Sequence, residues 1–528
     1  MALSYLERCL VWGLRGLAWL LFAVFRLFGP RRPPGLPRLA PVSNPLLLLS
    51  GVQLARKIRR REVSCMEVVQ AYIDRIQEVN PLINAMVKDR FPAALQEAAQ
   101  VDRLVREESG DEDSLQDRLP LLGVPLSVKE AFALQGMPQT SGLLSRRGLI
   151  TRCDASAVAL LKRAGAIPLG VTNTSEVCMW LESSNWLYGT TNNPYSTDRI
   201  VGGSSGGEGC ILGSAGSVIG IGSDIGGSIR LPAFFNGIFG HKPTPGIVPN
   251  EGQFPCASGL QNNFLCTGPM CRYAEDLLLM LRVMAGPNAQ RLDLSSDVDL
   301  KKLRFFSVPH DGGSIFVSPI DMQLIEAQKK VVERLEADLE IKVQRVQIPQ
   351  LKYSFQIWSA MMSEQDEEGR CPKSFTELLG DHGKPVWPFW ELVKWTVRQS
   401  SHTLAAIGLA ILERFQSAQP SQFVLQKKKE LETQLEKMLG SDGVLLYPTY
   451  PHIAPKHHHP LFTPFNFAYT GIFNILGLPV TQCPVGLSRE GLPLGLQVIA
   501  NKHCDRLTIA TAVHLEKATG GWRDPGAV

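Results

Sequence analysis

Short apolar runs alternate with helical patterns along much of the chain. The apolar runs cover residues 121–128, 166–172, 217–223, 443–448, 478–485 and 492–500. Runs of this length are typical of buried strands. Longer patterns with helical spacing, such as residues 272–286, lie between several of them. Buried strands that alternate with helices predict an α/β architecture.

Two segments outside these runs have clear local signals. Ser64 and Glu67 have the spacing of a capping box, which predicts a helix that begins just after Ser64. The acidic and polar residues 107–117 predict an exposed loop.

Residues 386–415 are unusually rich in tryptophan, with Trp387, Trp390 and Trp395 close together. One interpretation is a pair of core helices. The other is a helical cap whose aromatic face enters a lipid interface. The sequence leaves both open.

The N-terminal segment is apolar from residue 10 to residue 28, with Arg15 and Arg26 as its charged residues. Its length suits a bilayer, which needs about 20 apolar residues. A helix lying in the membrane interface is the main alternative to a span. A cleaved signal peptide is disfavoured, because prolines follow the segment instead of a small-residue cleavage site.

A proline-rich joint at residues 29–45 follows this segment, and no second clear linker occurs. We therefore expect a membrane anchor and joint over residues 1–45 and one large catalytic domain over residues 46–528.

The composition narrows the classes of function. Hydrophobic residues make up 44% of the chain and charged residues 20%, which is typical of a globular protein. The net charge is only +4 and no basic stripe occurs, so we expect no nucleic-acid partner. The 11 cysteines form no CxxC pair, which disfavours zinc and favours mostly buried free thiols. For His457–His459 we favour a solvated loop over a metal site.

The stretch at residues 202–233 combines many glycines and serines with isoleucine, valine and leucine. A flexible linker does not carry such an apolar centre. A phosphate-binding P-loop needs a lysine, and none occurs between Lys162 and Lys242. The letters GGSSG fit the GxSxG nucleophile elbow of α/β-hydrolases, which also needs a downstream acid and histidine. That alternative stays open.

A serine can also be activated by a neutral lysine, with a second serine relaying the proton. Lys129 ends the predicted buried strand GVPLSVK, and burial lowers the pKa of a lysine. Ser204 lies in GGSSGG and Ser228 lies in SDIGGSIRLPA. These residues are candidates for the base, the relay and the nucleophile.

Backbone N–H groups near the start of the predicted helix after Ser228 are candidates for an oxyanion hole, which stabilises a tetrahedral intermediate. We expect Asp224 and Arg230 to pair and hold this turn, and Ser223 to be a structural hydroxyl. The candidate donors are Ile225, Gly226, Gly227 and Ser228.

The motifs GVPLSVKE, GGSSGGEG, GSDIGGSIRLPA and GHKPTPG follow one another in this order. Together they resemble the amidase signature family, over about residues 50–515. The resemblance implies a large mixed central β-sheet surrounded by helices, with Lys129 as base, Ser204 as relay and Ser228 as acylated nucleophile. It also implies a cis peptide bond between Gly203 and Ser204. No metal or cofactor is implied, because side chains and backbone fill every role.

Within this family, the N-terminal segment and SEVCMWLESSN at residues 175–185 are similar to fatty-acid amide hydrolases. That similarity implies long-chain primary amides such as oleamide and N-acylethanolamines such as anandamide as substrates. It also implies attachment to the endoplasmic reticulum or lipid droplets. The expected partners are a lipid amide and a membrane, and a homodimer stays open. The alternatives are an amidotransferase-type amidase that acts on glutamine with partner subunits, and a catalytically idle lipid-binding homologue.

Overall fold

The computed structural model describes residues 38–107, 112–381, 383–414 and 420–528. The predicted anchor at residues 10–28 lies outside the described residues. Within the described ranges, no helix is both long enough and apolar enough to cross a bilayer.

A mixed β-sheet of 11 strands forms the centre of the fold, in the order β1-β3-β2-β6-β8-β7-β12-β13-β11-β9-β10. This confirms the predicted α/β class with a large mixed sheet. The strands of this sheet are β1 (Met86–Asp89), β2 (Pro125–Lys129), β3 (Ile167–Thr172), β6 (Ile219–Asp224), β7 (Phe239–Lys242), β8 (Cys266–Cys271), β9 (Arg304–Ser307), β10 (Gln344–Arg345), β11 (Gly443–Pro448), β12 (Val480–Leu487) and β13 (Pro493–Ile499). A separate small sheet pairs β4 (Ser184–Asn185) with β5 (Gly189–Thr190).

The six apolar runs predicted as strands are β2, β3, β6, β11, β12 and β13. They are apolar throughout because helices cover both faces of the sheet. In β11, Val444 and Leu446 pack into one core cluster, whereas Leu445 and Tyr447 pack into another on the opposite face.

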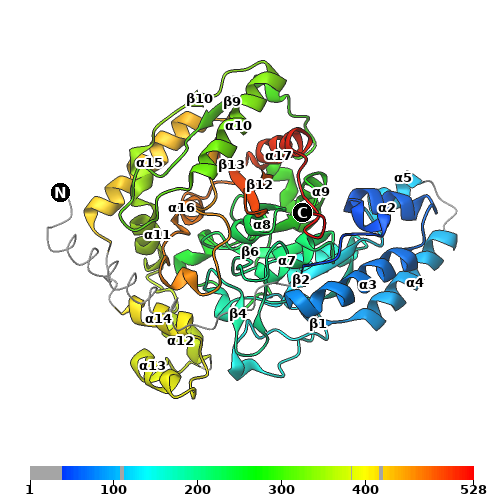
Figure 1. The fold of residues 1–528 in the computed structure, drawn as a ribbon, viewed down its shortest axis with the longest axis horizontal. Helices are drawn as coiled ribbons and strands as arrows, with labels where there is room; N and C mark the ends of the chain where they lie inside the picture. Colours follow the sequence, from blue (N-terminus) through cyan, green and yellow to red (C-terminus); the bar gives the residue numbers. More distant parts are fainter. Residues whose placement is uncertain (1–37, 108–111, 382, 415–419) are drawn as a thin grey trace.

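Helices surround the sheet (Figure 1). Residues of α2, α3, α9 and α17 contribute to the larger core cluster, and residues of α11, α15 and α16 contribute to the second. The α-helices are α2 (Gly51–Arg59), α3 (Cys65–Ile83), α4 (Phe91–Glu107), α5 (Glu112–Arg118), α6 (Ser156–Arg163), α7 (Gly206–Gly213), α8 (Arg230–Phe235), α9 (Glu275–Ala285), α10 (Met322–Leu339), α11 (Ser354–Met362), α12 (Phe375–Gly380), α13 (Pro388–Thr396), α14 (Leu404–Glu413), α15 (Gln422–Leu439), α16 (Ala468–Ile475) and α17 (Asp505–Thr519).

Of the two local predictions near the N-terminal end of the described chain, the structure confirms one and corrects the other. Helix α3 begins directly after Ser64, and the capping box with Glu67 is present, as predicted. The exposed loop predicted over residues 107–117 is wrong in its second half, where α5 forms. Leu115 is buried there and Glu112 pairs with Arg60, so tertiary contacts stabilise a helix that the polar composition did not indicate.

The pairing of β2 with β6 positions the predicted chemistry. These two strands are parallel neighbours, so their carboxyl ends lie at the same edge of the sheet. Lys129 is the last residue of β2, and Asp224 is the last residue of β6. The turn that carries Ser228 follows β6 directly and leads into α8.

Candidate active site

Lys129 is completely buried at the end of β2. Its Nζ atom lies 2.7 Å from Ser204 Oγ and 2.9 Å from Ser223 Oγ, within hydrogen-bond distance of both. Within the described residues it forms no ion pair. Burial lowers the pKa of the Lys129 amine, and the neighbouring Cys178, Asp224 and Glu208 only partly oppose this effect. The contacts and the direction of the pKa shift both suit a neutral amine that exchanges a proton with Ser204.

Ser204 lies in a tight turn that leads into α7. The peptide bond between Gly203 and Ser204 is cis, as the resemblance predicted. Gly203 is required here, because a Cβ atom on it would lie 2.1 Å from the carbonyl oxygen of Trp180. Thr174 Oγ1 donates to the Ser204 carbonyl at 2.8 Å. The turn is therefore fixed from both sides.

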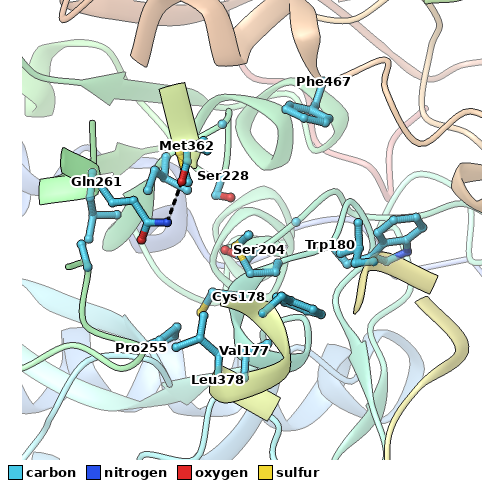
Figure 2. A pocket seen from close by; sticks show the side chains of 18 of the residues that line it. Val177, Cys178, Trp180, Ser204, Ser228, Pro255, Gln261, Met362, Leu378 and Phe467 are labelled. Atoms are coloured by element: carbon cyan, nitrogen blue, oxygen red, sulfur yellow. Dashed lines mark hydrogen bonds between the residues drawn. The ribbon is translucent and has the colours of Figure 1, made fainter. Parts of the chain in front are cut away.

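Ser228 lies in the turn between β6 and α8. The Ser205 N–H donates to the Ser228 carbonyl at 3.2 Å, which joins the two serine segments. The side chains of Ser204 and Ser228 both line one cavity (Figure 2). The structure therefore brings together all three residues predicted from the sequence.

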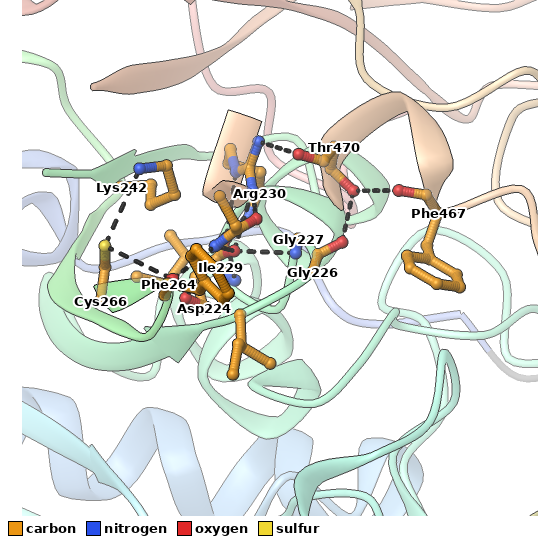
Figure 3. Close-up of polar contacts among 12 residues, drawn as sticks. Asp224, Gly226, Gly227, Ile229, Arg230, Lys242, Phe264, Cys266, Phe467 and Thr470 are labelled. Atoms are coloured by element: carbon orange, nitrogen blue, oxygen red, sulfur yellow. Dashed lines mark hydrogen bonds and ion pairs between the residues drawn. The ribbon is translucent and has the colours of Figure 1, made fainter. Parts of the chain in front are cut away.

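Asp224 and Arg230 hold the turn, as the sequence suggested. Both are completely buried, with Arg230 Nη2 2.9 Å from Asp224 Oδ1 and Arg230 Nε 3.0 Å from Asp224 Oδ2. Although burial opposes it, the charge of Arg230 holds the pKa of Asp224 well below its ordinary value. Arg230 also donates to Thr470 O at 2.9 Å, Gln497 Oε1 at 2.8 Å and Asn474 Oδ1 at 2.7 Å, which ties the turn to α16 and β13 (Figure 3).

One of the four predicted oxyanion donors, the Gly227 N–H, already forms a hydrogen bond within the turn. Gly227 has a φ of +123°, and its N–H donates to Asp224 Oδ1 at 2.8 Å. The expectation that its N–H is free for an oxyanion is therefore not met. The turn itself requires this hydrogen bond, because the Asp224 carboxylate caps it. Ile225, Gly226 and Ser228 remain the predicted donors.

Two further side chains at this site were not predicted to take part. Ser223, expected from the sequence to be a structural hydroxyl, places its Oγ atom 2.9 Å from Lys129 Nζ. Glu208 on α7 accepts hydrogen bonds from Ser127 Oγ at 2.6 Å and Thr172 Oγ1 at 2.7 Å. Burial raises the pKa of Glu208 to about 7. Its place in the GGSSGGEG motif was the available signal, but the contacts depend on the pairing of β2 with β3 and β6.

The cavity above these residues has a volume of about 230 Å³ and mostly apolar walls. We call β2, α7, β6 and α8, with the turns between them, the catalytic floor. Helices α12, α13 and α14 form a second unit, the cap, and Phe375, Leu378, Leu409 and Leu412 of the cap line the same cavity. Ser204 and Ser228 therefore lie beneath an apolar chamber with one wall supplied by the cap.

Of the two interpretations of residues 386–415, the structure favours the cap. Trp387 is 60% exposed and Trp390 is 54% exposed, and Phe389, Val393 and Val397 are also exposed. Helix α13 is therefore not a core helix. The cap extends from one side of the molecule (Figure 1).

The segment 175–182, here called the strap, forms another wall of the cavity through Cys178 and Trp180. Glu176 lies 2.7 Å from His402, which precedes α14. Near its other end, Glu182 lies 2.5 Å from His457. Two His–Glu contacts therefore hold the strap against the cap and against the 457–459 loop.

His457 is buried by its contact with Glu182. Its side chain is only 7% exposed, so the solvated loop expected there is wrong at this residue. Burial would raise the pKa of Glu182, but its contact with His457 outweighs this and holds the pKa below its ordinary value. The described part of the chain contains no group of three side chains placed to hold a metal ion. None of the described cysteines forms a disulfide, and only about half of them are buried.

The class of this protein follows from a family comparison. The Amidase family model matches residues 67–509, so the chain belongs to the amidase family. A solved structure described as "Fatty acid amide hydrolase" shares the fold with a TM-score of 0.70 over 90% of this chain and 86% of that chain, at 23% sequence identity.

Similarity to curated relatives is much higher. The chain is 70% identical to "Fatty-acid amide hydrolase 2-A" of Danio rerio over 526 residues, which is 100% of this chain and 99% of the relative. It is 58% identical to "Fatty-acid amide hydrolase 2" of Homo sapiens over 534 residues, with 100% of both chains covered. A glutamyl-tRNA(Gln) amidotransferase subunit from Cyanothece sp. is 28% identical over 494 residues, which is 89% of this chain and 98% of the relative.

Proposed function

We propose that this chain is a serine hydrolase that cleaves long-chain fatty-acid amides, including primary amides such as oleamide and N-acylethanolamines, to a fatty acid and an amine. The observation that carries the proposal is the contact of 2.7 Å between the buried Lys129 amine and Ser204 Oγ, beneath an apolar cavity that Ser228 also lines. The names of the relatives at 58–70% identity support the same class of substrate.

In the proposed acylation, neutral Lys129 takes a proton from Ser204, which takes the proton of Ser228. Ser228 Oγ then bonds to the amide carbonyl carbon, and the carbonyl oxygen becomes an oxyanion. Backbone N–H groups of the turn, including those of Ile225 and Gly226, stabilise this charge. The C–N bond breaks as Ser204 donates its proton to the leaving nitrogen and regains one from Lys129. An amine leaves poorly unless it is protonated, so this return of the proton is essential.

Deacylation uses the same groups in the same order. Water attacks the acyl ester on Ser228, and its proton passes through Ser204 to Lys129. The ester C–O bond then breaks, Ser228 recovers a proton along the same route, and the fatty acid leaves. The Lys129 amine ends the cycle neutral.

The alternatives are less well supported. A catalytically idle homologue would not need the buried lysine in contact with the relay serine. A glutamine amidotransferase needs a polar chamber for its substrate, whereas Phe375, Leu409 and Leu412 give this cavity apolar walls. The lower identity of 28% to an amidotransferase relative points the same way.

Membrane attachment is part of the proposal. The exposed tryptophans of the cap suit the interface of a bilayer, where amphipathic rings are favoured. Leu409 and Leu412 line the cavity from the neighbouring helix α14, so a lipid amide in that interface would lie close to the catalytic serines. The apolar residues 10–28 supply a second attachment. Endoplasmic reticulum or lipid droplet is the location we propose from the resemblance.

Labelling with a fluorophosphonate probe, together with oleamide hydrolysis, tests the nucleophile. We expect both to be lost in Ser228→Ala and retained in Ser145→Ala, an exposed serine outside the site. Labelling that persists in Ser228→Ala would show that another residue is the nucleophile. A wild-type protein that is not labelled would support the idle homologue, and labelling with glutamine turnover but no oleamide turnover would support the amidotransferase.

A further inference from the structure

Trp358 connects the wall of the cavity to the oxyanion turn. It lies on α11, is partly buried, and lines the same cavity as Ser204 and Ser228. Its ring packs edge-to-face on Phe467, with centroids 4.7 Å apart and an angle of 78° between the planes. Its indole Nε1–H donates to the carbonyl oxygen of Ile225 at 3.0 Å.

This hydrogen bond orients a predicted oxyanion donor. The peptide between Ile225 and Gly226 is trans, so its C=O and N–H groups point in opposite directions. When the indole holds the Ile225 carbonyl, it also fixes the direction of the Gly226 N–H. A hydrogen bond to the carbonyl further polarises the peptide and makes its N–H a stronger donor.

The next peptide of the turn is held in a different way. Thr470 Oγ1 donates to Gly226 O at 2.7 Å, and the Gly227 N–H donates to Asp224 (Figure 3). Both partners belong to the buried Arg230 network. The Ile225 carbonyl is instead held by Trp358, whose ring borders the cavity. Of these two peptides, the first is therefore the one that a ligand in the cavity can influence.

The neighbouring helix leaves room for the indole in this position. A Cβ atom on Gly471 of α16 would lie 2.9 Å from Trp358 Cδ1, which is too close. Glycine within a helix is destabilising relative to alanine. The space required by the indole explains why a glycine occupies this position of α16.

We propose that Trp358 is a positioning residue for the oxyanion hole and couples acyl-chain binding to the chemical step. An acyl chain that packs on the indole ring holds the Nε1–H on Ile225 O and thereby holds the Gly226 N–H in place. Long acyl chains then raise kcat as well as affinity. The inference rests on the proposed function, because it requires Ser228 to form a tetrahedral oxyanion.

Trp358→Phe tests this in the full-length protein, since it removes the N–H and keeps an aromatic ring. Loss of a direct oxyanion donor lowers kcat by about 10²–10³-fold, and we expect about 10–100-fold for this indirect support. KM for oleamide should change much less. Affinity for an oleoyl trifluoromethyl ketone, whose hemiketal carries the oxyanion, should fall by the same factor as kcat, while inhibition by oleic acid should stay nearly constant.

Further variants separate positioning from a simple loss of cavity wall. Gly471→Ala should displace the indole and give the same pattern as Trp358→Phe while retaining the tryptophan. Phe467→Leu alters the cavity wall without removing a hydrogen bond to the turn, so it should change ketone and fatty-acid binding together. In Trp358→Phe, the kcat advantage of oleamide over a short-chain amide should shrink.

Two results would overturn the inference. In the first, Trp358→Phe weakens binding of the ketone and of oleic acid by the same factor, which would show that Trp358 only forms part of the cavity wall. The other is unchanged kcat and ketone affinity. Failure of the proposed function would look different, because the wild-type protein would then not turn over oleamide, or its turnover would survive in Ser228→Ala.

Discussion

The catalytic floor and the cap border the same cavity but are built in different ways. Strands β2 and β6 and helix α8 are buried along their whole length. The floor is packed around glycines: a Cβ atom on Gly207 would lie 2.4 Å from Asn173 N, and one on Gly220 would lie 2.1 Å from Glu208 Oε2. In contrast, α13 buries only Pro388 and Glu391.

We expect this difference to separate the residues that react from the residues that select the substrate. A side chain added in the floor has no space, so the floor holds the reacting groups in one arrangement. Many side chains of α13 project into solvent and can change without disturbing the core. Variation among amidases in what they cleave should therefore concentrate in units such as the cap.

The largest expected effect comes from the floor. Lys129→Ala removes the proposed base, and general acid–base catalysis contributes about 10²–10⁴-fold. We expect kcat/KM for oleamide to fall by about this factor and that for methyl oleate to fall by about ten-fold less, since an alkoxide leaves more readily than an amide nitrogen. Lys329→Ala, at an exposed lysine of α10, is the matched control. Equal losses for amide and ester would contradict the relay through Ser204.

A smaller effect should come from the cap. Replacing Trp387 and Trp390 together by serine removes apolar surface that we propose enters the lipid interface. Loss of about 1.4 kcal/mol of binding free energy weakens membrane affinity ten-fold. Hydrolysis of oleamide presented in vesicles should fall by about ten-fold. Turnover of a short soluble ester should not change. Met322→Ser, at an exposed methionine of α10, is the control. A parallel loss on the soluble ester would show that the cap acts on the floor and not on lipid.

The smallest effect should again lie in the floor. Where Glu208 is ionised, above a pH of about 7, its charge raises the pKa of Lys129, so Glu208→Gln should lower that pKa further. Activity requires neutral Lys129 and rises with pH through its pKa. The acidic limb of kcat/KM for amides should therefore move to lower pH. Ser127 and Thr172 can still bond to the glutamine. A limb that stays in place or moves to higher pH would show that Glu208 is only structural.

Much of the floor could be predicted from the sequence, because its signals are local. The strand that ends at Lys129 is a continuous apolar run, and the glycine–serine motifs place Ser204 and Ser228 in tight turns. What could not be predicted depends on contacts between distant segments. Trp358 reaches Ile225 from a helix more than a hundred residues later, and nothing in its own surroundings indicates this.

For the cap, the sequence predicted helices but not which side of them faces solvent. Two of its three helices, α13 and α14, were expected, but apolar residues at helical spacing do not reveal whether they face a core or solvent. The exposure of Trp387 and Trp390 is decided by where α13 lies relative to the sheet. The anchor at residues 10–28 stays a prediction, because it lies outside the described residues.

The guanidinium of Arg230 has a consequence for how this protein loses activity on heating. One buried side chain joins the oxyanion turn to α16 and β13, and separating a buried charge pair costs about 3–5 kcal/mol. Local unfolding of the turn, with the core intact, therefore has a high free-energy cost. Thermal inactivation should coincide with melting of the tertiary structure. We expect discrimination between substrates to depend on the exposed cap and therefore to fade at lower temperatures.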